Sequence, residues 1–328
     1  MTEKKMSNTF PLLDIKNLSV EFRTRSGVVK ALEDVSLEVF RGEIVGIVGE
    51  SGSGKSVSAL TAMGILDPAG HVTAGSISLG GLDVLGAGEA VLQTMRGQQA
   101  SMIFQSPRTS LNPIRTVGKQ IGDVLHRHNM ADRQNLREKV IKSLKTVRIP
   151  DPDRRFDAYP FELSGGMCQR IMIAMALACS PELLIADEPT TGLDVTTQAA
   201  IMDLIRDLSR ERNMATVLIT HDLAMAADYC DRIIVMHAGH VVESGSSHDL
   251  FTSPRHPYTA KLMKATPHGG GNLDDIASIP GGLPDLRGVL PPCRFSGRCE
   301  RHEAICDSSA MITKEVSPNH FVNCQRPL

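Results

Sequence analysis

Tryptophan is absent from the 328 residues, and the other aromatic residues are few, with 3 tyrosines and 9 phenylalanines. Proteins that hold single-stranded nucleic acid stack its bases on aromatic side chains, so this shortage argues against such a binding platform. An excess of positive charge is also missing, because 35 Lys and Arg residues are set against 37 Asp and Glu residues, a net charge of −2. A basic surface for nucleic acid is therefore not expected, and we predict no nucleic-acid partner.

Long apolar runs are missing as well. A membrane-spanning helix needs roughly 18 to 20 consecutive apolar residues, and the longest candidate, residues 171–179, soon meets Pro181. The N-terminal sequence MTEKKMSNTF carries charges with no apolar stretch behind them, which is not the pattern of a secretory signal. We expect a chain in the cytoplasm that reaches a membrane only through partner proteins.

The apolar residues that are present, 41% of the chain, suffice for one large or two ordinary domains. Residues 12–40 contain short alternating apolar runs broken at residues 25–27, a pattern that predicts antiparallel strands. Beyond Glu43, strand-like and helix-like segments alternate, which predicts an α/β fold with a mainly parallel sheet. The strand-like runs are residues 44–48, 102–104, 183–186, 216–219 and 233–236. A helical insert is expected at about 106–180, where no strand is convincing.

A glycine-rich loop with the pattern G-x-x-x-x-G-K-S follows the strand-like run 44–48 and precedes a helix-like segment at 57–66. Its glycines let backbone N–H groups turn toward phosphates, and the N-terminus of the following helix adds positive potential. Lys55 should reach the terminal phosphates of a nucleotide, and Ser56 should bind Mg²⁺. The predicted nucleotide-binding residues of this loop are Gly49, Ser51, Gly52, Ser53, Gly54, Lys55, Ser56 and Val57.

Two other short motifs can be interpreted beside this loop. The apolar run 183–186 ends in Asp187 and Glu188, at the strand end where ligands bind in open α/β sheets. Asp187 is placed to hold Mg²⁺, and Glu188 to polarise the attacking water. Ser164-Gly165-Gly166 precedes an apolar helical segment, where it is either a simple helix cap or a second phosphate-binding element. A second element of this kind makes sense if it completes a site on another subunit.

These motifs, together with Gly192-Leu193-Asp194 and His221, occur in the order and spacing of the ATP-binding subunits of ABC transporters. The chain resembles that family over roughly residues 12–250. The resemblance implies a P-loop fold, with a RecA-like α/β core, an antiparallel β subdomain and a helical subdomain. It also implies hydrolysis of ATP with Mg²⁺ by a dimer of nucleotide-binding subunits.

The resemblance assigns roles to single residues. It makes Gln105 the residue that senses Mg²⁺ and the attacking water and moves with the permease contact, and Asp194 the residue that links the two sites of the dimer. His221 is expected to contact the γ-phosphate. Phe22 is the candidate for stacking on adenine, with ordinary strand packing as the alternative. Cys168 departs from the family, which usually has a basic or polar residue there, but the phosphate-contacting residues are intact.

Further stretches resemble the dipeptide, oligopeptide and nickel importer ATPases: residues 104–113, 187–196 and 255–259. Ser106 departs from the acidic residue common there. This subfamily implies a related second ATP-binding subunit in a heterodimer, two permeases and an extracytoplasmic substrate-binding protein, at the cytoplasmic face of the inner membrane. The alternatives are an exporter ATPase, which usually lacks a cysteine-rich tail, and a soluble ABC protein of translation or DNA repair. The cargo stays open among dipeptides, longer peptides, nickel complexes and glycosides.

The tail differs in composition from the rest of the chain. We predict an ATPase domain at 12–265, then a Gly/Pro-rich linker and a small cysteine-rich domain at 266–328. Four cysteines follow one another as C-x5-C-x6-C-x17-C: Cys293, Cys299, Cys306 and Cys324. Thiolates suit iron–sulfur clusters and zinc alike, although structural zinc sites favour closer cysteine pairs. The subfamily resemblance favours a [4Fe–4S] cluster with a structural role, and zinc or free thiols are the alternatives.

Overall fold

The computed structural model describes residues 10–265 and 279–328, which form two compact units. Unit 1 contains residues 40–42 and 86–217, and unit 2 contains residues 10–39, 43–85, 218–265 and 279–328. The predicted linker around Gly269-Gly270-Gly271 and most of the N-terminal segment considered as a signal lie outside the described residues.

Unit 2 contains an antiparallel sheet in the order β2-β1-β4-β5. The long strands β1 (Leu13–Thr24) and β2 (Gly27–Val39) form a hairpin, which confirms the antiparallel strands predicted for residues 12–40. Strand β4 (Gly70–Leu79) pairs with the other edge of β1, and the short β5 (Leu82–Asp83) follows it. The buried side chains of this sheet are apolar residues at alternating positions, so one face supplies part of the core of unit 2.

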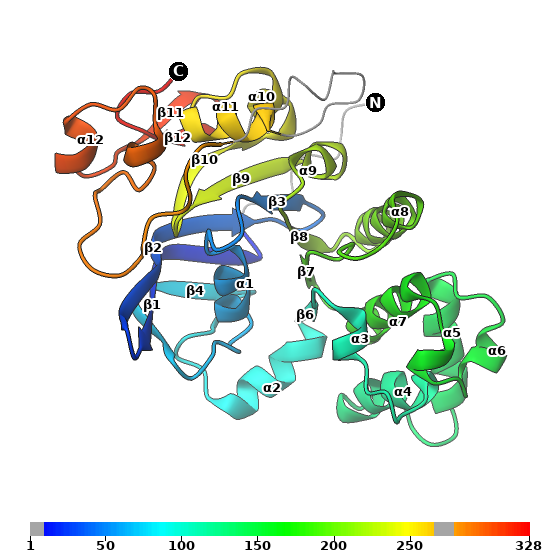
Figure 1. Cartoon of the computed structure of the whole chain (residues 1–328). Coiled ribbons are helices and arrows are strands. Elements are labelled where there is room, and N and C mark those ends of the chain that lie inside the picture. The colour runs from blue at the N-terminus through cyan, green and yellow to red at the C-terminus, as the bar shows by residue number, and fades with distance from the viewer. Residues whose placement is uncertain (1–9, 266–278) are drawn as a thin grey trace. The chain divides into compact units, whose positions relative to one another are not determined.

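A second sheet in unit 2 carries the candidate site. Strand β3 (Ile44–Val48) runs parallel to β9 (Arg232–His237), and β10 (His240–Ser246) continues antiparallel from β9. All five residues of β3 are buried, so both faces of the strand are covered, and this explains why none of them has a polar side chain. The helices of unit 2 are α1 (Lys55–Ala62), α9 (Leu223–Tyr229), α10 (Ser247–Thr252), α11 (Pro257–Lys264) and α12 (Ile305–Ser308) (Figure 1).

Residues 279–328, here called the C-terminal segment, belong to unit 2. After a short 3-10 turn, η3 (Ser296–Arg298), they form a hairpin of β11 (Thr313–Ser317) and β12 (His320–Asn323). Strand β12 pairs with β10, so the segment extends the sheet that contains β3. The sequence analysis did not predict these two strands.

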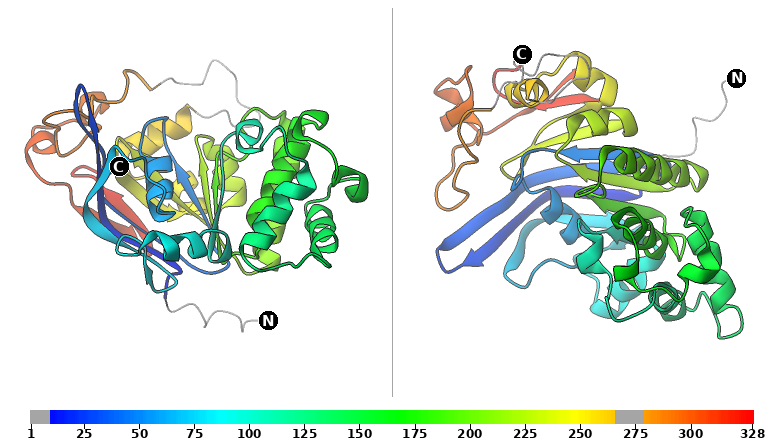
Figure 2. Two further views of the ribbon diagram at one scale, coloured as in Figure 1. Left: turned by 90° about the horizontal axis from the view of Figure 1, so that it is seen from below. Right: turned by 45° about the vertical axis from the view of Figure 1, so that its right-hand side comes forward.

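In unit 1, strands β6 (Ala100–Ile103) and β7 (Leu183–Asp187) are parallel and in register from Ala100↔Leu183 onward. Between them the described chain is helical, and Figure 2 shows these helices in green. The helices of unit 1 are α2 (Glu89–Gln98), α3 (Pro107–Ser110), α4 (Val117–Arg127), α5 (Leu136–Thr146), α6 (Pro152–Arg155), η1 (Pro160–Glu162), α7 (Gly165–Leu177) and α8 (Val195–Glu211). Strand β8 (Ala215–Thr220) crosses from unit 1 to unit 2.

The strand-like runs of the sequence correspond to β3, β6, β7, β8 and β9, which confirms the predicted α/β class. Within residues 10–265 and 279–328, no helix has both the length and the apolar character needed to cross a bilayer.

Candidate functional site

The glycine-rich loop of residues 49–54 connects β3 to α1 in unit 2. Gly49 has φ +154° and Gly54 has φ +102°, conformations that side chains disfavour. Space is also limited, because a Cβ on Gly49 would lie 2.1 Å from the carbonyl oxygen of Met236, and one on Gly54 2.6 Å from Leu32 Cδ2. Glycine at these two positions therefore lets the backbone close tightly in front of α1.

Lys55, the first residue of α1, points back into the loop. Its Nζ donates to the carbonyl oxygens of Gly49 at 2.8 Å and Glu50 at 2.9 Å, and the residue is 5% exposed. Ser56 is exposed, as are Ser51 and Gly52, whereas Val57 is half-buried. Ser53 Oγ is buried, with no hydrogen-bond partner among the described residues. The loop thus combines a fixed ammonium group with exposed hydroxyl and backbone groups, as phosphate binding requires.

The two carboxylates predicted at the end of β7 lie in unit 1. Asp187 is the last strand residue and is 8% exposed. Glu188 follows with φ +46°, a left-handed conformation that costs a non-glycine residue about 1–3 kcal/mol. Strained backbone of this kind is concentrated at functional sites, so the turn favours a functional role for Glu188.

The structure brings Gln105 to Glu188. Glu188 Oε2 accepts hydrogen bonds from Gln105 Nε2 at 2.7 Å and from Thr191 Oγ1 at 3.0 Å. Gln105 follows β6, the neighbour of β7, and parallel strands end at the same edge of a sheet. Two predicted site residues that are 83 positions apart therefore meet directly.

Ser164 caps α7, and its Oγ accepts the Met167 N–H at 3.3 Å. Ser164 is exposed, and Gly165 and Gly166 are half-buried. A Cβ on Gly166 would lie 2.8 Å from Thr197 Cγ2, so glycine allows α8 to approach the start of α7. Cys168 lies on the inner side of α7, buried, and its thiol is 3.4 Å from the carbonyl oxygen of Pro160. This unusual residue therefore does not alter the exposed end of the helix.

Asp194 caps α8 in the same unit. Its Oδ1 accepts the Thr197 N–H at 3.0 Å, and its Oδ2 accepts the Thr197 hydroxyl at 2.8 Å. These hydrogen bonds, the backbone one first, lower the pKa of the Asp194 carboxyl. The carboxylate is therefore ionised and fixed at the N-terminus of α8, where the helix dipole also favours negative charge.

The two remaining candidates of the nucleotide site are in unit 2. His221 is exposed and follows β8, immediately before Asp222, which caps α9. Phe22 lies in β1 opposite Val29 of β2 and is half-buried. Its ring is close to Gly70, since a Cβ there would lie 3.0 Å from Phe22 Cε1. The ring is therefore partly engaged in strand packing.

The four cysteines of the C-terminal segment line one small cavity, of about 10 Å³, together with His256 and Phe295. Cys293, Cys306 and Cys324 are buried and Cys299 is half-buried, and all four are free thiols. Burial raises the pKa of Cys293 to about 11 and also raises that of Cys299 and Cys324. In the described parts of the chain, no group of three or more His, Cys, Asp or Glu side chains is arranged to hold a metal ion.

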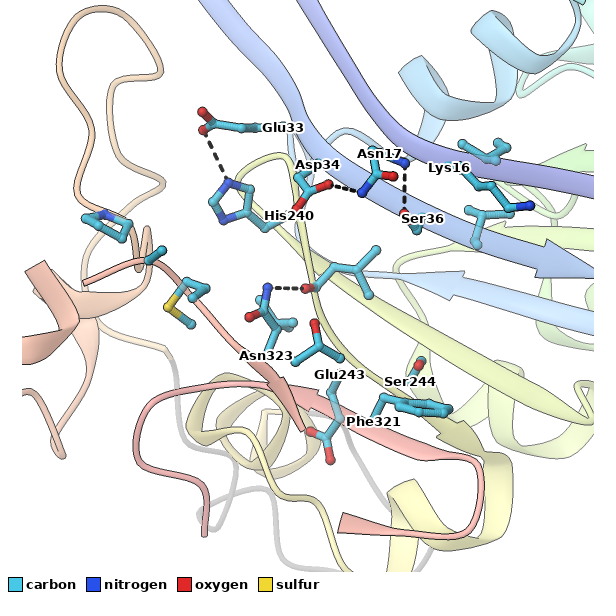
Figure 3. A pocket seen from close by; sticks show the side chains of 18 of the residues that line it. Lys16, Asn17, Glu33, Asp34, Ser36, His240, Glu243, Ser244, Phe321 and Asn323 are labelled. Atoms are coloured by element: carbon cyan, nitrogen blue, oxygen red, sulfur yellow. Dashed lines mark hydrogen bonds and ion pairs between the residues drawn. The ribbon is translucent and has the colours of Figure 1, made fainter. Parts of the chain in front are cut away.

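A cavity of about 770 Å³ lies elsewhere in unit 2, between β2 and the strands β10 and β12 (Figure 3). Figure 3 shows Glu33 bonded to His240, and Asp34 to Asn17, on its walls. The hydrogen bond to His240, with the nearby Arg294, lowers the pKa of Glu33 to about 2. None of the predicted nucleotide-site residues lines this cavity.

Neither Glu50, within the loop, nor Arg298, in the C-terminal segment, was among the predicted site residues. Arg298 Nη1 and Nη2 each donate to a carboxylate oxygen of Glu50 at 2.8 Å, and these bonds lower the pKa of Glu50. The motif at 255–259 was noted only for its resemblance to a subfamily, yet its Tyr258 hydroxyl accepts the Glu50 N–H. The sequence held one signal of this contact: Glu50 places a carboxylate beside the phosphate-binding glycines, where a basic partner is expected.

Comparisons with known proteins agree with this geometry. The family model described as "ABC transporter" matches residues 32–191, and the one described as "Oligopeptide/dipeptide transporter, C-terminal region" matches residues 242–306. The dipeptide transport ATP-binding protein DppD of Escherichia coli is 45% identical over 97% of this chain and 97% of its own. The chain belongs to the ABC transporter family. As an ABC transporter ATP-binding protein, it is an ATPase coupled to transport.

Other similar proteins of this ABC family agree. The oligopeptide transport ATP-binding protein OppD of Haemophilus influenzae is 46% identical to this ABC ATPase, covering 92% of this chain and 94% of its own. A dimeric ATP-binding cassette, MJ0796, solved with ADP and phosphate, has a TM-score of 0.64 and 30% identity over 72% of this chain and 98% of its own. CbiO1 of Clostridium perfringens has the same TM-score of 0.64 at 27% identity, over 74% of this chain and 91% of its own. These neighbours confirm the ABC ATPase fold.

Proposed function

We propose that this ABC ATPase energises the import of dipeptides or oligopeptides across the cytoplasmic membrane. The main support is the match of residues 242–306 to the C-terminal region of oligopeptide and dipeptide transporters. That region contains the motif at 255–259 and three of the four tail cysteines, features outside the generic nucleotide site. Relatives named for dipeptide or oligopeptide transport align over nearly the whole chain, which favours an importer over an exporter or a soluble ABC protein.

ATP binding is assigned to the loop of unit 2. Lys55 would exchange its bonds to the neutral Gly49 and Glu50 carbonyl oxygens for bonds to phosphate oxygens, in which both partners are ionised and attract each other more strongly. The Ser56 hydroxyl and the Asp187 carboxylate are hard oxygen ligands, which fit Mg²⁺. The bound ion would neutralise phosphate charge during hydrolysis. We further assign the Phe22 ring to the adenine, although its packing against Gly70 leaves only part of it accessible.

We assign hydrolysis to Glu188 and Gln105 of unit 1 and to His221 of unit 2. Phosphoryl transfer depends mostly on positioning and charge stabilisation, so a fixed carboxylate that orients water is the main requirement. Glu188 fits this requirement, because the hydrogen bonds from Gln105 and Thr191 fix its carboxylate. His221 would donate to the γ-phosphate. Ser164, Gly165, Gly166 and Asp194 would complete the site of a second subunit.

The complete transporter would contain a related second ATP-binding subunit, two permeases and an extracytoplasmic substrate-binding protein. The chain would then lie at the cytoplasmic face of the inner membrane, held there by the permeases. A heterodimer is proposed because the subfamily resemblance implies a related second ATP-binding subunit.

Reconstitution tests this function directly. The chain, co-purified with the permeases and second ATPase encoded beside it, is placed in liposomes with the binding protein outside. We expect a peptide-loaded binding protein to stimulate ATP hydrolysis, and labelled dipeptide to enter only when ATP is supplied. A complex carrying Lys55→Ala is the control, because it measures any peptide uptake that does not depend on ATP hydrolysis. Export of the peptide, or hydrolysis that never responds to the loaded binding protein, would contradict the proposal.

We also propose that Cys293, Cys299, Cys306 and Cys324 hold a [4Fe–4S] cluster with a structural role. Four soft donors around one cavity are the ligand set that such a cluster uses. The cavity measures only about 10 Å³ and the four thiols are not arranged to hold a metal ion in the described structure, so the segment would have to rearrange to take a cluster. When bound, the cluster would cross-link four separate parts of the C-terminal segment.

Anaerobic purification followed by metal analysis tests the cluster. We expect about four iron atoms and four acid-labile sulfides per chain, and near-complete loss of both in Cys299→Ser. Cys179→Ser is the matched control, because Cys179 is a free, buried cysteine in unit 1. Stoichiometric zinc without sulfide, or metal-free thiols, would overturn the cluster assignment.

A further inference from the structure

Glu50 of the phosphate-binding loop is held by a residue of the C-terminal segment. Arg298 forms a bidentate ion pair with it, Nη1 to Oε2 and Nη2 to Oε1, each at 2.8 Å. The Arg298 side chain is 8% exposed and that of Glu50 28%, so solvent screens this pair less than an exposed one. Bidentate pairs between arginine and a carboxylate fix orientation as well as distance. Glu50 is therefore restrained in both.

The guanidinium group is itself fixed. Arg298 Nε donates to the carbonyl oxygen of Pro280 at 3.0 Å, so all three nitrogens of the group are used. Its Cζ lies 5.8 Å from the centre of the buried Phe295 ring, within the range of a cation–π contact. The C-terminal segment thus presents a preorganised arginine to the loop.

The backbone of Glu50 is held as well. Its N–H donates to Tyr258 Oη at 3.1 Å, and its carbonyl oxygen accepts from Lys55 Nζ at 2.9 Å. Tyr258 is fully buried against His237 and Phe295, with ring centres 4.5 and 5.3 Å away. Burial lowers the pKa of His237 to about 4, so this packing is between neutral rings at physiological pH.

A third contact reaches the loop beyond Glu50. A Cβ on Gly52 would lie 3.2 Å from Leu283 Cδ1, so the start of the C-terminal segment is in contact with the exposed turn of the loop. The segment is anchored behind these contacts by Glu243, which accepts from the Arg255 and His256 N–H groups at 2.6 and 2.9 Å and pairs with His320 of β12 at 2.7 Å. The C-terminal segment, which contacts the loop, is therefore itself held to β10 through the pairing of Glu243 with His320.

We propose that Arg298 of the C-terminal segment and Tyr258 of α11 are positioning residues of the nucleotide site, which hold the phosphate-binding loop in its ATP-binding conformation. Neither residue touches ATP in this proposal; each acts through Glu50. The proposal rests on the proposed function only in taking the loop to bind ATP.

Variants of Arg298 test it in the assembled transporter. We expect Arg298→Met to raise the KM for ATP about tenfold with kcat within twofold of wild type, because the loop loses its restraint while Glu188 keeps its own. Arg298→Lys should be intermediate, since an ammonium group cannot form the bidentate pair. Tyr258→Phe, which removes only the hydroxyl, should raise KM by a smaller factor. Arg287→Met is the matched control, because Arg287 also donates from two nitrogens, Nε and Nη2, to a carboxylate, that of Asp285 in the same segment.

A double-mutant cycle separates this role from general stability. If Arg298 acts through Glu50, then adding Glu50→Gln to Arg298→Met should change KM no further, whereas independent effects would multiply. The proposal would be overturned by an unchanged KM in Arg298→Met, whether or not kcat and the melting temperature fall. Effects on KM that multiply in the double-mutant cycle would overturn it as well. A wild-type complex that binds ATP but imports no peptide would instead refute the proposed function and leave the arginine effect measurable.

Discussion

Glu188→Gln should leave Mg-ATP binding within about twofold of wild type and slow hydrolysis by the assembled transporter at least about 100-fold. Glutamine has nearly the same shape, and its carbonyl oxygen can still accept the hydrogen bonds that Gln105 and Thr191 donate. It lacks the negative charge that polarises water for attack on the γ-phosphate. Nucleotide binding and single-turnover hydrolysis, measured on the same preparation, would separate these two effects.

Glu182→Gln provides the control for this experiment. Glu182 immediately precedes the same strand, β7, and forms an ion pair with Arg41 at the surface. Exposed pairs contribute little to stability, so turnover should stay close to wild type. Near-normal hydrolysis by Glu188→Gln would remove the assignment of Glu188 as the residue that activates water.

Lys55→Ala should weaken ATP binding about 100-fold or more. The lysine offers two or three charge-assisted hydrogen bonds to phosphate oxygens, each contributing about 1.5–3 kcal/mol. Its amine already points into the loop, so wild type needs little rearrangement to make them. Equilibrium binding of ATP gives the dissociation constant directly.

The control for Lys55→Ala is Lys142→Ala, which removes an exposed lysine from α5 in unit 1. It should leave ATP affinity unchanged, and a thermal melt of both variants shows whether either is misfolded. An affinity for ATP that is the same in Lys55→Ala as in wild type would exclude the loop as the phosphate site.

Much of the fold follows from local sequence pattern. The runs that became β3 and β7 are apolar at nearly every position because both faces of each strand are buried, and such runs are visible without any partner. The glycine pattern of the loop is equally local, since it reflects backbone conformations at Gly49 and Gly54 that other residues do not tolerate. Local patterns of this kind were sufficient to predict the class of the fold.

Contacts between distant residues could not be predicted in the same way. The bonds from Gln105 to Glu188 and from Arg298 to Glu50 join residues 83 and 248 positions apart, and no periodicity specifies them. Strands β11 and β12 were missed because they have only 5 and 4 residues, without a clear alternation of apolar and polar residues, so only the pairing of β12 with β10 and β11 identifies them. The family resemblance gave Gln105 a role, but neither resemblance nor pattern gave one to Arg298.

The hydrogen bond between Gln105 and Glu188 has a mechanical consequence. Gln105 begins a segment that includes α3 and ends near Ile114, which is 82% exposed, and both ends of the bond belong to unit 1. A displacement of this segment would reach the Glu188 carboxylate through the 2.7 Å hydrogen bond from Gln105. If Glu188 orients water as proposed, the rate of ATP hydrolysis would then depend on the position of this segment.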